Sequence, residues 1–418
     1  MVAWALRGRI LTPTERGKIR FFDDGVIVVD ARGRIEAVGD RQSTHVPGVL
    51  YDVHPNLVIP GFVDAHVHYP QTRIIGRATG PLLRWLNKSV FPEEARFRDA
   101  DYARVVAEEF IDRMLAVGTT SAAIFSSSSA VATEVLFERL AERGMRGVVG
   151  LTLMDRRAPK ALAVERKRAL RDADRLVARW HEHDGRLRFA VTPRFALSCS
   201  RALLRDAGSL ASAQALPVQT HISENESECA ATLEAHAYAR DYLDVYERAG
   251  LVGPRTILAH AVHLSAREWK RLHRAEASVA HCPDSNFFLG SGRMPLARAR
   301  VGKLALGSDV AAGRSFSMRR AMASAYDNAL CVNETITPAE LFRLATLEGA
   351  RALGFSAQSG SLEPGKDADL VVLRAAADAQ NAADLLSGLI FDGDDLAVLA
   401  CYVRGRRLDQ VAPGPRER

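Results

Sequence analysis

Three short segments, far apart in the chain, carry residue types that bind metal ions. His66 and His68 end an apolar stretch, His221 follows another, and Asp309 follows a third. Residues two apart on a strand point to the same side, so His66 and His68 can reach a single ion. An ion held by imidazoles and one carboxylate, with one position left open, ionises water near neutral pH. The segments therefore predict a metal-dependent hydrolase.

Each of these residues also has a plainer interpretation. Paired histidines alone are more often core or surface residues, but a buried aspartate such as Asp309 is costly unless it meets a cation. Judged together, His66, His68, His221 and Asp309 favour a metal site. Glu224 follows His221 closely and is either a proton-transferring carboxylate or a solvated loop residue. His260 is either a further ligand or a neutral hydrogen-bonding partner of the attacking water.

Short apolar runs alternate with helix-like segments along most of the chain, and this predicts a parallel (β/α)8 barrel of the TIM type. Segments with helical periodicity include 100–117, 164–183 and 227–249. The eight runs expected as barrel strands are 57–68, 119–125, 147–154, 187–192, 217–221, 256–260, 277–281 and 303–309.

The candidate residues fall at the carboxyl ends of these runs, where barrel enzymes place their chemistry. His66 and His68 end the first run, His221 and Glu224 end the fifth, and Asp309 ends the eighth. Arg194, His260 and His281 likewise follow the fourth, sixth and seventh runs. Placement of this kind is not expected by chance.

Both ends of the chain differ from the middle. Alternating strand-like pieces occur in residues 1–56 and again in residues 361–418, separated by Gly, Pro and Asp turns. We expect the two ends to pair into a small composite β-sandwich domain beside a hydrolase barrel formed by residues 57–360.

The composition is that of an ordinary soluble globular protein, with 47% hydrophobic and 25% charged residues. The formal net charge of +6 does not favour nucleic-acid binding, because only 7 of the 56 basic residues are lysines and the arginines are scattered. The five cysteines form no C-x-x-C pair, so neither a disulfide framework nor a thiolate zinc site is expected. No stretch is long and apolar enough for a bilayer, and a cytoplasmic protein without membrane partners is predicted.

Several motifs resemble the amidohydrolase superfamily and, more narrowly, the guanine deaminase family. The superfamily resemblance rests on Pro60-Gly-Phe-Val-Asp-Ala-His-Val-His68, Ala280-His-Cys-Pro-Asp-Ser-Asn286 and Gly307-Ser-Asp-Val310. The narrower one rests on His68-Tyr-Pro-Gln-Thr72, on 83–94 with its ending Phe-Pro-Glu-Glu94, on Val191-Thr-Pro-Arg-Phe195, on 220–226 and on 309–318. It runs through nearly the whole chain.

The resemblance implies hydrolytic deamination of guanine to xanthine and ammonia, in purine catabolism, by a homodimer. It implies one zinc ion per subunit on His66, His68, His221 and Asp309, although iron suits the same ligands. Glu224 would be the proton shuttle, acting with Asp309 on the water, and His260 would assist. Gln71, Arg194 and Phe195 would hold the purine.

The chemistry of the residues agrees with that implication. Arginine offers only donors, and guanine presents O6 and N7 as adjacent acceptors, so Arg194 would favour guanine over adenine. Gln71 has one donor and one acceptor group, which suits a lactam. Phe195 and Trp85 would stack on or close over the ring, although core packing explains them equally well.

Two departures and two rivals remain. The serine run 126–129 replaces a segment in which relatives often carry a histidine, and Ala312 stands where a glycine is usual. Both bear on fine specificity. The rival functions are deamination or dechlorination of another heterocycle, such as an oxidised purine, a pterin or a triazine, and a non-catalytic scaffold.

Overall fold

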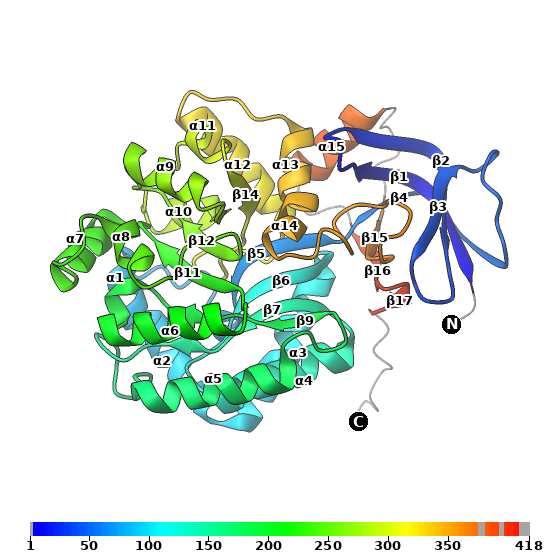
Figure 1. The fold of residues 1–418 in the computed structure, drawn as a ribbon. Helices are drawn as coiled ribbons and strands as arrows, with labels where there is room; N and C mark the ends of the chain where they lie inside the picture. Colours follow the sequence, from blue (N-terminus) through cyan, green and yellow to red (C-terminus); the bar gives the residue numbers. More distant parts are fainter. Residues whose placement is uncertain (1–2, 375–380, 393–396, 409–418) are drawn as a thin grey trace.

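The main part of the molecule is a closed barrel of parallel strands ringed by helices (Figure 1). The structure is a computed structural model that describes residues 3–374, 381–392 and 397–408. Around the barrel the strands are β5 (Phe62–His68), β6 (Thr119–Phe125), β7 (Arg146–Gly150) continued by β8 (Thr152–Leu153), β9 (Leu187–Phe189) continued by β10 (Thr192–Pro193), β11 (Val218–Ile222), β12 (Thr256–His260), β13 (Ser278–His281) and β14 (Lys303–Leu306).

Two joints close the barrel. Val191 and Val218 form a parallel bridge between the β9–β10 connection and β11. Between the last and first strands, Asp309 N donates to His66 O at 2.8 Å and His68 N donates to Val310 O at 3.3 Å. The predicted parallel barrel is therefore confirmed, and its closing joint passes through three candidate metal ligands, His66, His68 and Asp309.

Helices cover the outside of the barrel and begin at conventional capping residues. Ser129 accepts a hydrogen bond from Ala132 N at the start of α4, and Ser265 forms a capping box with Glu268 at the start of α9. The longer helices are α3 (Ala100–Ala116), α4 (Ala130–Arg143), α5 (Arg166–Trp180), α6 (Arg201–Ala213), α7 (Glu226–Ala235), α9 (Ala266–Arg274), α12 (Met318–Cys331) and α15 (Ala382–Phe391). Shorter ones are α8 (Tyr242–Glu247), α10 (Pro283–Phe288), α11 (Leu296–Ala299), α13 (Pro338–Leu344) and α14 (Leu347–Ala352).

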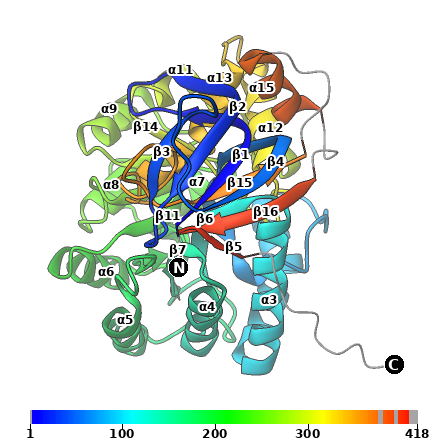
Figure 2. The same ribbon diagram turned by 90° about the vertical axis from the view of Figure 1, so that its right-hand side faces the viewer.

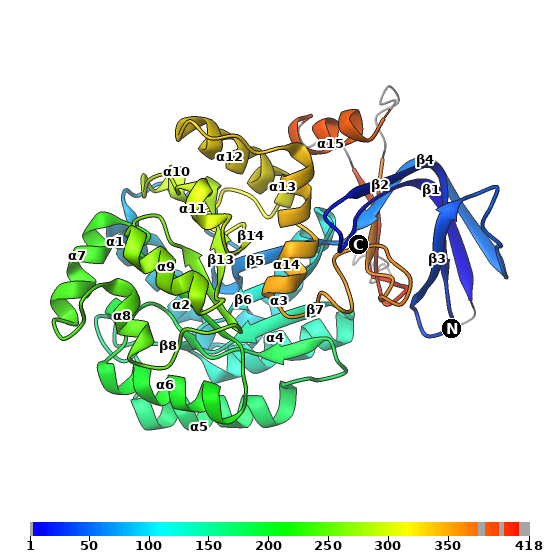
Figure 3. The ribbon, with the colours of Figure 1, turned by 45° about the horizontal axis from the view of Figure 1, so that its top comes forward.

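The segment between β5 and α3 is a chain of short helices that lies over the carboxyl end of the barrel. It consists of η1 (Tyr69–Gln71), α1 (Leu82–Trp85), η2 (Leu86–Val90), α2 (Phe91–Glu94) and η3 (Ala95–Arg98), and η4 (Ala196–Ser198) follows β10. Figure 3 shows α1, α7 and α8 on the side of the barrel opposite the small sheet.

Both chain ends build one small sheet beside the barrel. In Figure 2 this sheet lies in front of the barrel. Its strand order is β17-β16-β15-β4-β1-β2-β3, and only β1 and β4 pair in parallel. We expected a β-sandwich; the described strands form a single seven-stranded sheet. Its strands are β1 (Trp4–Pro13), β2 (Ile19–Val29), β3 (Ile35–Asp40), β4 (Val49–Pro60), β15 (Leu370–Leu373), β16 (Val398–Val403) and β17 (Arg406–Arg407).

The expectation of one continuous strand over residues 57–68 needs correction. Leu57–Pro60 belongs to β4 and pairs with β15 in the small sheet, and only Phe62–His68 enters the barrel. Gly61 makes the change of sheet possible, because a Cβ there would lie 2.0 Å from Thr120 Oγ1. The domain boundary at residue 57, which β4 crosses, stays a prediction, and residues 409–418 of the predicted terminal domain lie outside the described residues.

Candidate active site

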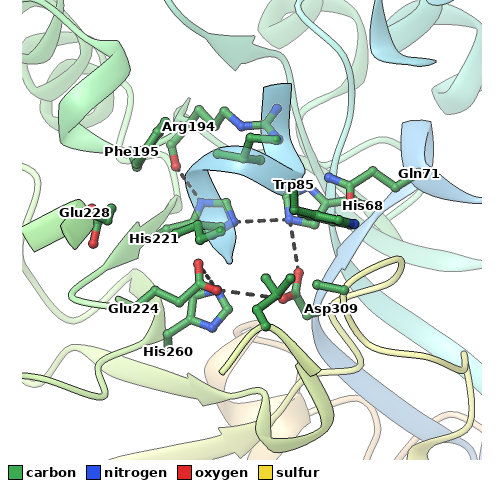
Figure 4. A pocket seen from close by; sticks show the side chains of 14 residues that line it. His68, Gln71, Trp85, Arg194, Phe195, His221, Glu224, Glu228, His260 and Asp309 are labelled. Atoms are coloured by element: carbon green, nitrogen blue, oxygen red, sulfur yellow. Dashed lines mark hydrogen bonds and ion pairs between the residues drawn. The ribbon is translucent and has the colours of Figure 1, made fainter. Parts of the chain in front are cut away.

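Four histidines and one aspartate converge at the carboxyl end of the barrel (Figure 4 labels all but His66). His66, His221, His260 and Asp309 each offer one ligand atom, and these atoms lie within 4.8 Å of one another. His68 Nε2 lies 3.1 Å from His221 Nε2 and 3.3 Å from Asp309 Oδ1. The structure thus brings the four expected ligands together and adds His260, with His68 placed beside the group of four by its contacts with His221 and Asp309.

Hydrogen bonds fix which ring nitrogen of two histidines is available. His221 Nδ1 donates to Arg194 O at 2.5 Å, and His260 Nδ1 lies 3.0 Å from Asn286 Oδ1, which accepts its proton. The Nε2 atom of each ring is then unprotonated, and its lone pair faces the cluster. This is the usual arrangement of metal-binding histidines.

Buried nitrogen atoms without partners mark the same point. Within the part of the chain that the structure describes, the Nε2 atoms of His66 and His260 are buried and have no hydrogen-bond partner. Buried polar atoms in folded proteins nearly always have one. A divalent cation at the centre of the cluster would satisfy both, and the donor set of imidazoles and a carboxylate fits such an ion.

The protonation states also suit a cation. Burial lowers the pKa of each histidine in the cluster, to about 3 for His68, so the imidazoles are neutral. Burial raises the pKa of Asp309, but the close contacts of His66 and His68 with its carboxylate, each at 3.3 Å, outweigh burial, and the net pKa lies well below the usual range. The cluster therefore presents neutral nitrogen donors and one anionic oxygen.

The backbone is strained directly behind the cluster. Ser223, His260, Ala261 and Asp309 all have positive φ, at 48°, 73°, 55° and 49°. Residues other than glycine rarely adopt this conformation, and such strain gathers at functional sites. Here it turns the chain sharply at the ends of three strands and keeps the ligands aimed inward.

Glu224 lies beside the cluster and is buried, in contrast to the solvated-loop alternative. Its Oε1 accepts a hydrogen bond from Ser291 Oγ at 3.1 Å, and its Oε2 lies 3.5 Å from His260 Nε2. Burial, reinforced by the charge of Asp309, raises the pKa of Glu224 to about 8. A carboxyl group whose pKa lies near neutrality can both take up and release a proton.

A cavity of about 420 Å³ opens above the cluster, a volume typical of small-molecule sites. Every predicted site residue except His66 lines it. The lining residues are His68, Gln71, Leu82, Trp85, Leu86, Arg194, Phe195, His221, Glu224, Glu228, His260, Leu289, Asp309 and Ala312.

Arg194 and Gln71 share one carboxylate. Arg194 Nη1 donates to Glu94 Oε2 at 2.6 Å, and Gln71 Nε2 donates to Glu94 Oε1 at 3.3 Å. Gln71 Oε1 accepts a hydrogen bond from Ala311 N at 3.1 Å. The oxygen that we expected Gln71 to turn toward a lactam is thus already held by the backbone.

The two aromatic candidates border the cavity and also belong to the hydrophobic core. Phe195 forms a parallel bridge with His221, which places its side chain near the ligands. The indole Nε1 of Trp85 is buried and has no hydrogen-bond partner among the described residues, so it can donate to a bound ring.

Four residues of the site carry no role in the sequence prediction: Glu94, Glu228, Asn286 and Ser291. Glu94 and Asn286 end motifs that we quoted for the resemblance, but only the fold shows which distant side chains they meet. The serine run 126–129 does not line the cavity, whereas Ala312 does. Of the two departures, only Ala312 borders the cavity.

Comparisons with known proteins identify the family of the chain. The model of the Amidohydrolase family matches residues 57–408. The chain is 36% identical to the guanine deaminase of Escherichia coli (strain K12) over 406 residues, which cover 93% of this chain and 92% of the relative. It is 40% identical to the probable guanine deaminase of Deinococcus radiodurans over 409 residues, covering 95% and 93%.

A solved structure gives the same result for the fold. The crystal structure of guanine deaminase from C. acetobutylicum, with bound guanine in its active site, superposes with a TM-score of 0.90 at 30% identity. The superposition covers 97% of this chain and 99% of that one.

Proposed function

The chain belongs to the amidohydrolase family and, within it, to the guanine deaminases, and from this premise we propose how its residues hydrolyse guanine to xanthine and ammonia. The observation that carries the proposal is that one cavity is lined both by Arg194 and by Glu224 with the histidine–aspartate cluster. A purine held by the first would present its amino-bearing carbon to the second.

We propose zinc as the resident ion, with His66, His68, His221 and Asp309 as ligands. The unpartnered Nε2 atom of His66 and the fixed tautomer of His221 support this choice, and iron would suit the same donors. Bound there, the ion supplies a Lewis acid that ionises water near neutral pH. His260 acts as a fifth ligand or as a hydrogen-bonding partner of the water.

The purine is oriented by donors on one side of the cavity. Arg194 directs N–H groups to O6 and N7 of guanine. Adenine binds poorly, because it has an amine donor in place of the O6 acceptor. Gln71 keeps one N–H for the ring after its bond to Glu94. Phe195 and Trp85 pack on the ring and exclude water.

Glu224 moves the protons. Ser291 occupies its Oε1, so its Oε2 takes the proton from water while the oxygen bonds to C2 of guanine. Glu224 passes that proton to N3, and Asp309 assists as a second acceptor. The hydroxyl at C2 then gives its proton through Glu224 to the exocyclic amine, the C2–N bond breaks as the C2=O bond forms, and ammonia leaves. A pKa near 8 suits a group that must do both.

The direct test is the absorbance change from guanine to xanthine, with and without a chelator. A small panel that contains an oxidised purine, a pterin and a triazine, assayed for ammonia release, tests the substrate. We expect guanine to have the highest kcat/KM. Failure to deaminate guanine, together with turnover of another heterocycle, would overturn the proposal.

Substitution Arg194→Ala tests the orientation of the purine. We expect the affinity for guanine and its preference over adenine to fall, because the cavity then lacks donors facing O6 and N7. An unchanged kcat/KM would remove Arg194 from the pocket.

We also propose a cytoplasmic homodimer that acts in purine catabolism. None of the five cysteines, all of which lie in described parts of the chain, forms a disulfide, which suits a reducing compartment, and the dimer and the pathway follow from the family resemblance. Among the described residues, no helix is long and apolar enough to cross a membrane. Light scattering on purified protein tests the oligomeric state.

A further inference from the structure

We propose that Glu94 sets both the geometry and the charge of the purine pocket, and that this favours neutral guanine over the more acidic product. The inference rests on the proposed function. Glu94 is not in the cavity lining, yet its two oxygens hold Arg194 and Gln71, the residues expected to contact the purine. It acts as a positioning residue through these two side chains.

The hydrogen bonds form a chain whose direction is fixed at both ends. Ala311 N can only donate, so it determines that Gln71 Oε1 faces the backbone and Gln71 Nε2 faces Glu94. Arg194 can only donate as well. The residue between them must therefore accept on both of its atoms. Among side chains of this shape, only a carboxylate does so.

The element that carries Glu94 holds Arg194 in a second way. Phe91 lies one turn earlier in α2, and the guanidinium carbon of Arg194 sits 5.3 Å from the centre of its ring. The aromatic face and the carboxylate together restrict the rotation of the guanidinium, which points its remaining N–H groups in one direction.

The ion pair is removed from solvent, so its charge balance matters to any ligand. The side chains of Arg194 and Glu94 are 4% and 1% exposed, and within the described structure Glu94 is the carboxylate in ion-pair contact with Arg194. Paired in this way, Arg194 offers directed donors with little net charge. An unpaired buried guanidinium would attract anions strongly, and xanthine ionises more readily than guanine.

The test compares Glu94→Gln with Glu93→Gln. Glu93 is the neighbouring carboxylate of α2 and is similarly buried, but its partners are Arg96 and Tyr102. At mildly alkaline pH, we expect Glu94→Gln to raise KM for guanine about tenfold, with a smaller change in kcat, because one charged hydrogen-bond network is broken. The ratio of the xanthine inhibition constant to KM for guanine should fall about tenfold or more, and Glu93→Gln should leave it unchanged.

A second variant separates charge from reach. Glu94→Asp keeps the buried negative charge but shortens the side chain, so KM for guanine should rise while the xanthine-to-guanine ratio stays within about threefold of wild type. If Glu94→Gln does not fold, Glu94→Asp still tests whether Glu94 positions Arg194 and Gln71. Melting temperatures of all variants show which of them are folded.

The outcomes are distinct. An unchanged ratio in Glu94→Gln, equal shifts in both glutamine variants, or the same ratio change in Glu94→Asp would overturn the role of Glu94 while guanine turnover by the wild type stood. Absence of guanine turnover by the wild type would overturn the proposed function and this inference with it.

Discussion

Two buried clusters of charged residues lie at opposite ends of the barrel, and they differ in how completely their atoms are paired. At the amino end, Arg146 donates to Asp369 Oδ2 at 2.9 Å and to Asp367 Oδ2 at 2.8 Å, and its side chain is fully buried. Asp369 Oδ1 accepts a further hydrogen bond from Arg404 N. At the carboxyl end, the Nε2 atoms of His66 and His260 have no hydrogen-bond partner among the described residues, although they lie 3.3 Å from Asp309 and 3.5 Å from Glu224, respectively.

The difference separates a structural cluster from a functional one. The Arg146 cluster joins the barrel to the segment that leads into β15. Both carboxylate oxygens of Asp369 and Oδ2 of Asp367 accept hydrogen bonds there. The histidine–aspartate cluster leaves ligand atoms open and is surrounded by strained backbone. Polar groups that are all hydrogen-bonded stabilise a fold. Polar atoms without hydrogen-bond partners and strained backbone are retained where a bound ligand completes the site.

Removal of the metal tests the open cluster with the largest expected effect. We expect a chelator to abolish guanine turnover and zinc to restore it, because the ligands alone cannot ionise water. Absorbance at fixed guanine concentration measures the rate, and elemental analysis measures the metal. Full activity in protein shown to be free of metal would contradict the proposed metal-dependent mechanism. The apoprotein should also melt at a lower temperature, since an ion bound only by the native state stabilises it.

Substitution of Glu224 breaks the proton transfer and leaves the cluster intact. Glu224→Gln keeps the size of the side chain but cannot take up the proton, so kcat should fall about 10²–10⁴-fold. Metal content and guanine binding should change little. Steady-state kinetics and elemental analysis check both, and near-normal turnover would remove Glu224 from the mechanism.

Substitution of Arg146 breaks the closed cluster instead. Arg146→Met removes the buried cation that Asp367 and Asp369 share, and we expect the free energy of unfolding to fall by about 3–5 kcal/mol. Denaturant unfolding measures this change. kcat of the folded fraction should stay at the wild-type level, because the cluster lies at the end of the barrel away from the cavity.

Arg404 provides a matched control for Arg146. Its side chain also contacts Asp367, at 3.3 Å, but is 36% exposed, so Arg404→Met should lower the free energy of unfolding by about 1 kcal/mol or less. Equal losses in the two variants would contradict the role assigned to the buried arginine.

A further prediction concerns the pH dependence of stability at Glu228, a cavity residue outside the proposed mechanism. Burial raises its pKa to about 7 from the ordinary value of 4.5. The folded protein therefore binds one more proton than the unfolded chain between these values, and this stabilisation, about 3 kcal/mol, is present in full below pH 4.5 and is lost as the pH rises through 7.

Glu228→Gln should remove this contribution. It keeps an acceptor for the hydroxyl of Tyr242, so the variant should gain stability relative to wild type as the pH rises from 4.5 to 7. Thermal unfolding at several pH values measures the difference. Parallel curves for the two proteins would show that Glu228 does not titrate in this range.

The barrel and the position of the site could be predicted because both depend on local pattern. An apolar run with a polar residue at its carboxyl end identifies a strand and an active-site position together, as at His221, His260 and Asp309. Family resemblance then supplied Gln71 and Arg194.

The remaining features depend on contacts between distant segments. Nothing local to Glu94 indicates that its oxygens meet Gln71 and Arg194, and nothing local to Arg146 indicates Asp367 and Asp369. The small sheet shows the same limit: alternation identified its strands, but their order in one sheet follows from tertiary pairing. The change of sheet at Gly61 had a local signal, a glycine within an apolar run.

Two hydrogen bonds join the first barrel strand to be synthesised to the end of the last one. They run from Asp309 N to His66 O and from His68 N to Val310 O. During synthesis, β5 leaves the ribosome early and keeps an unpaired edge until β14 has been made, which is a period of exposure to misassociation. Asp309, the last of the proposed ligands, arrives with the same joint. Binding of a metal ion by the proposed ligand set would therefore be confined to chains that have closed their barrel, and a nascent or truncated chain would hold no complete site.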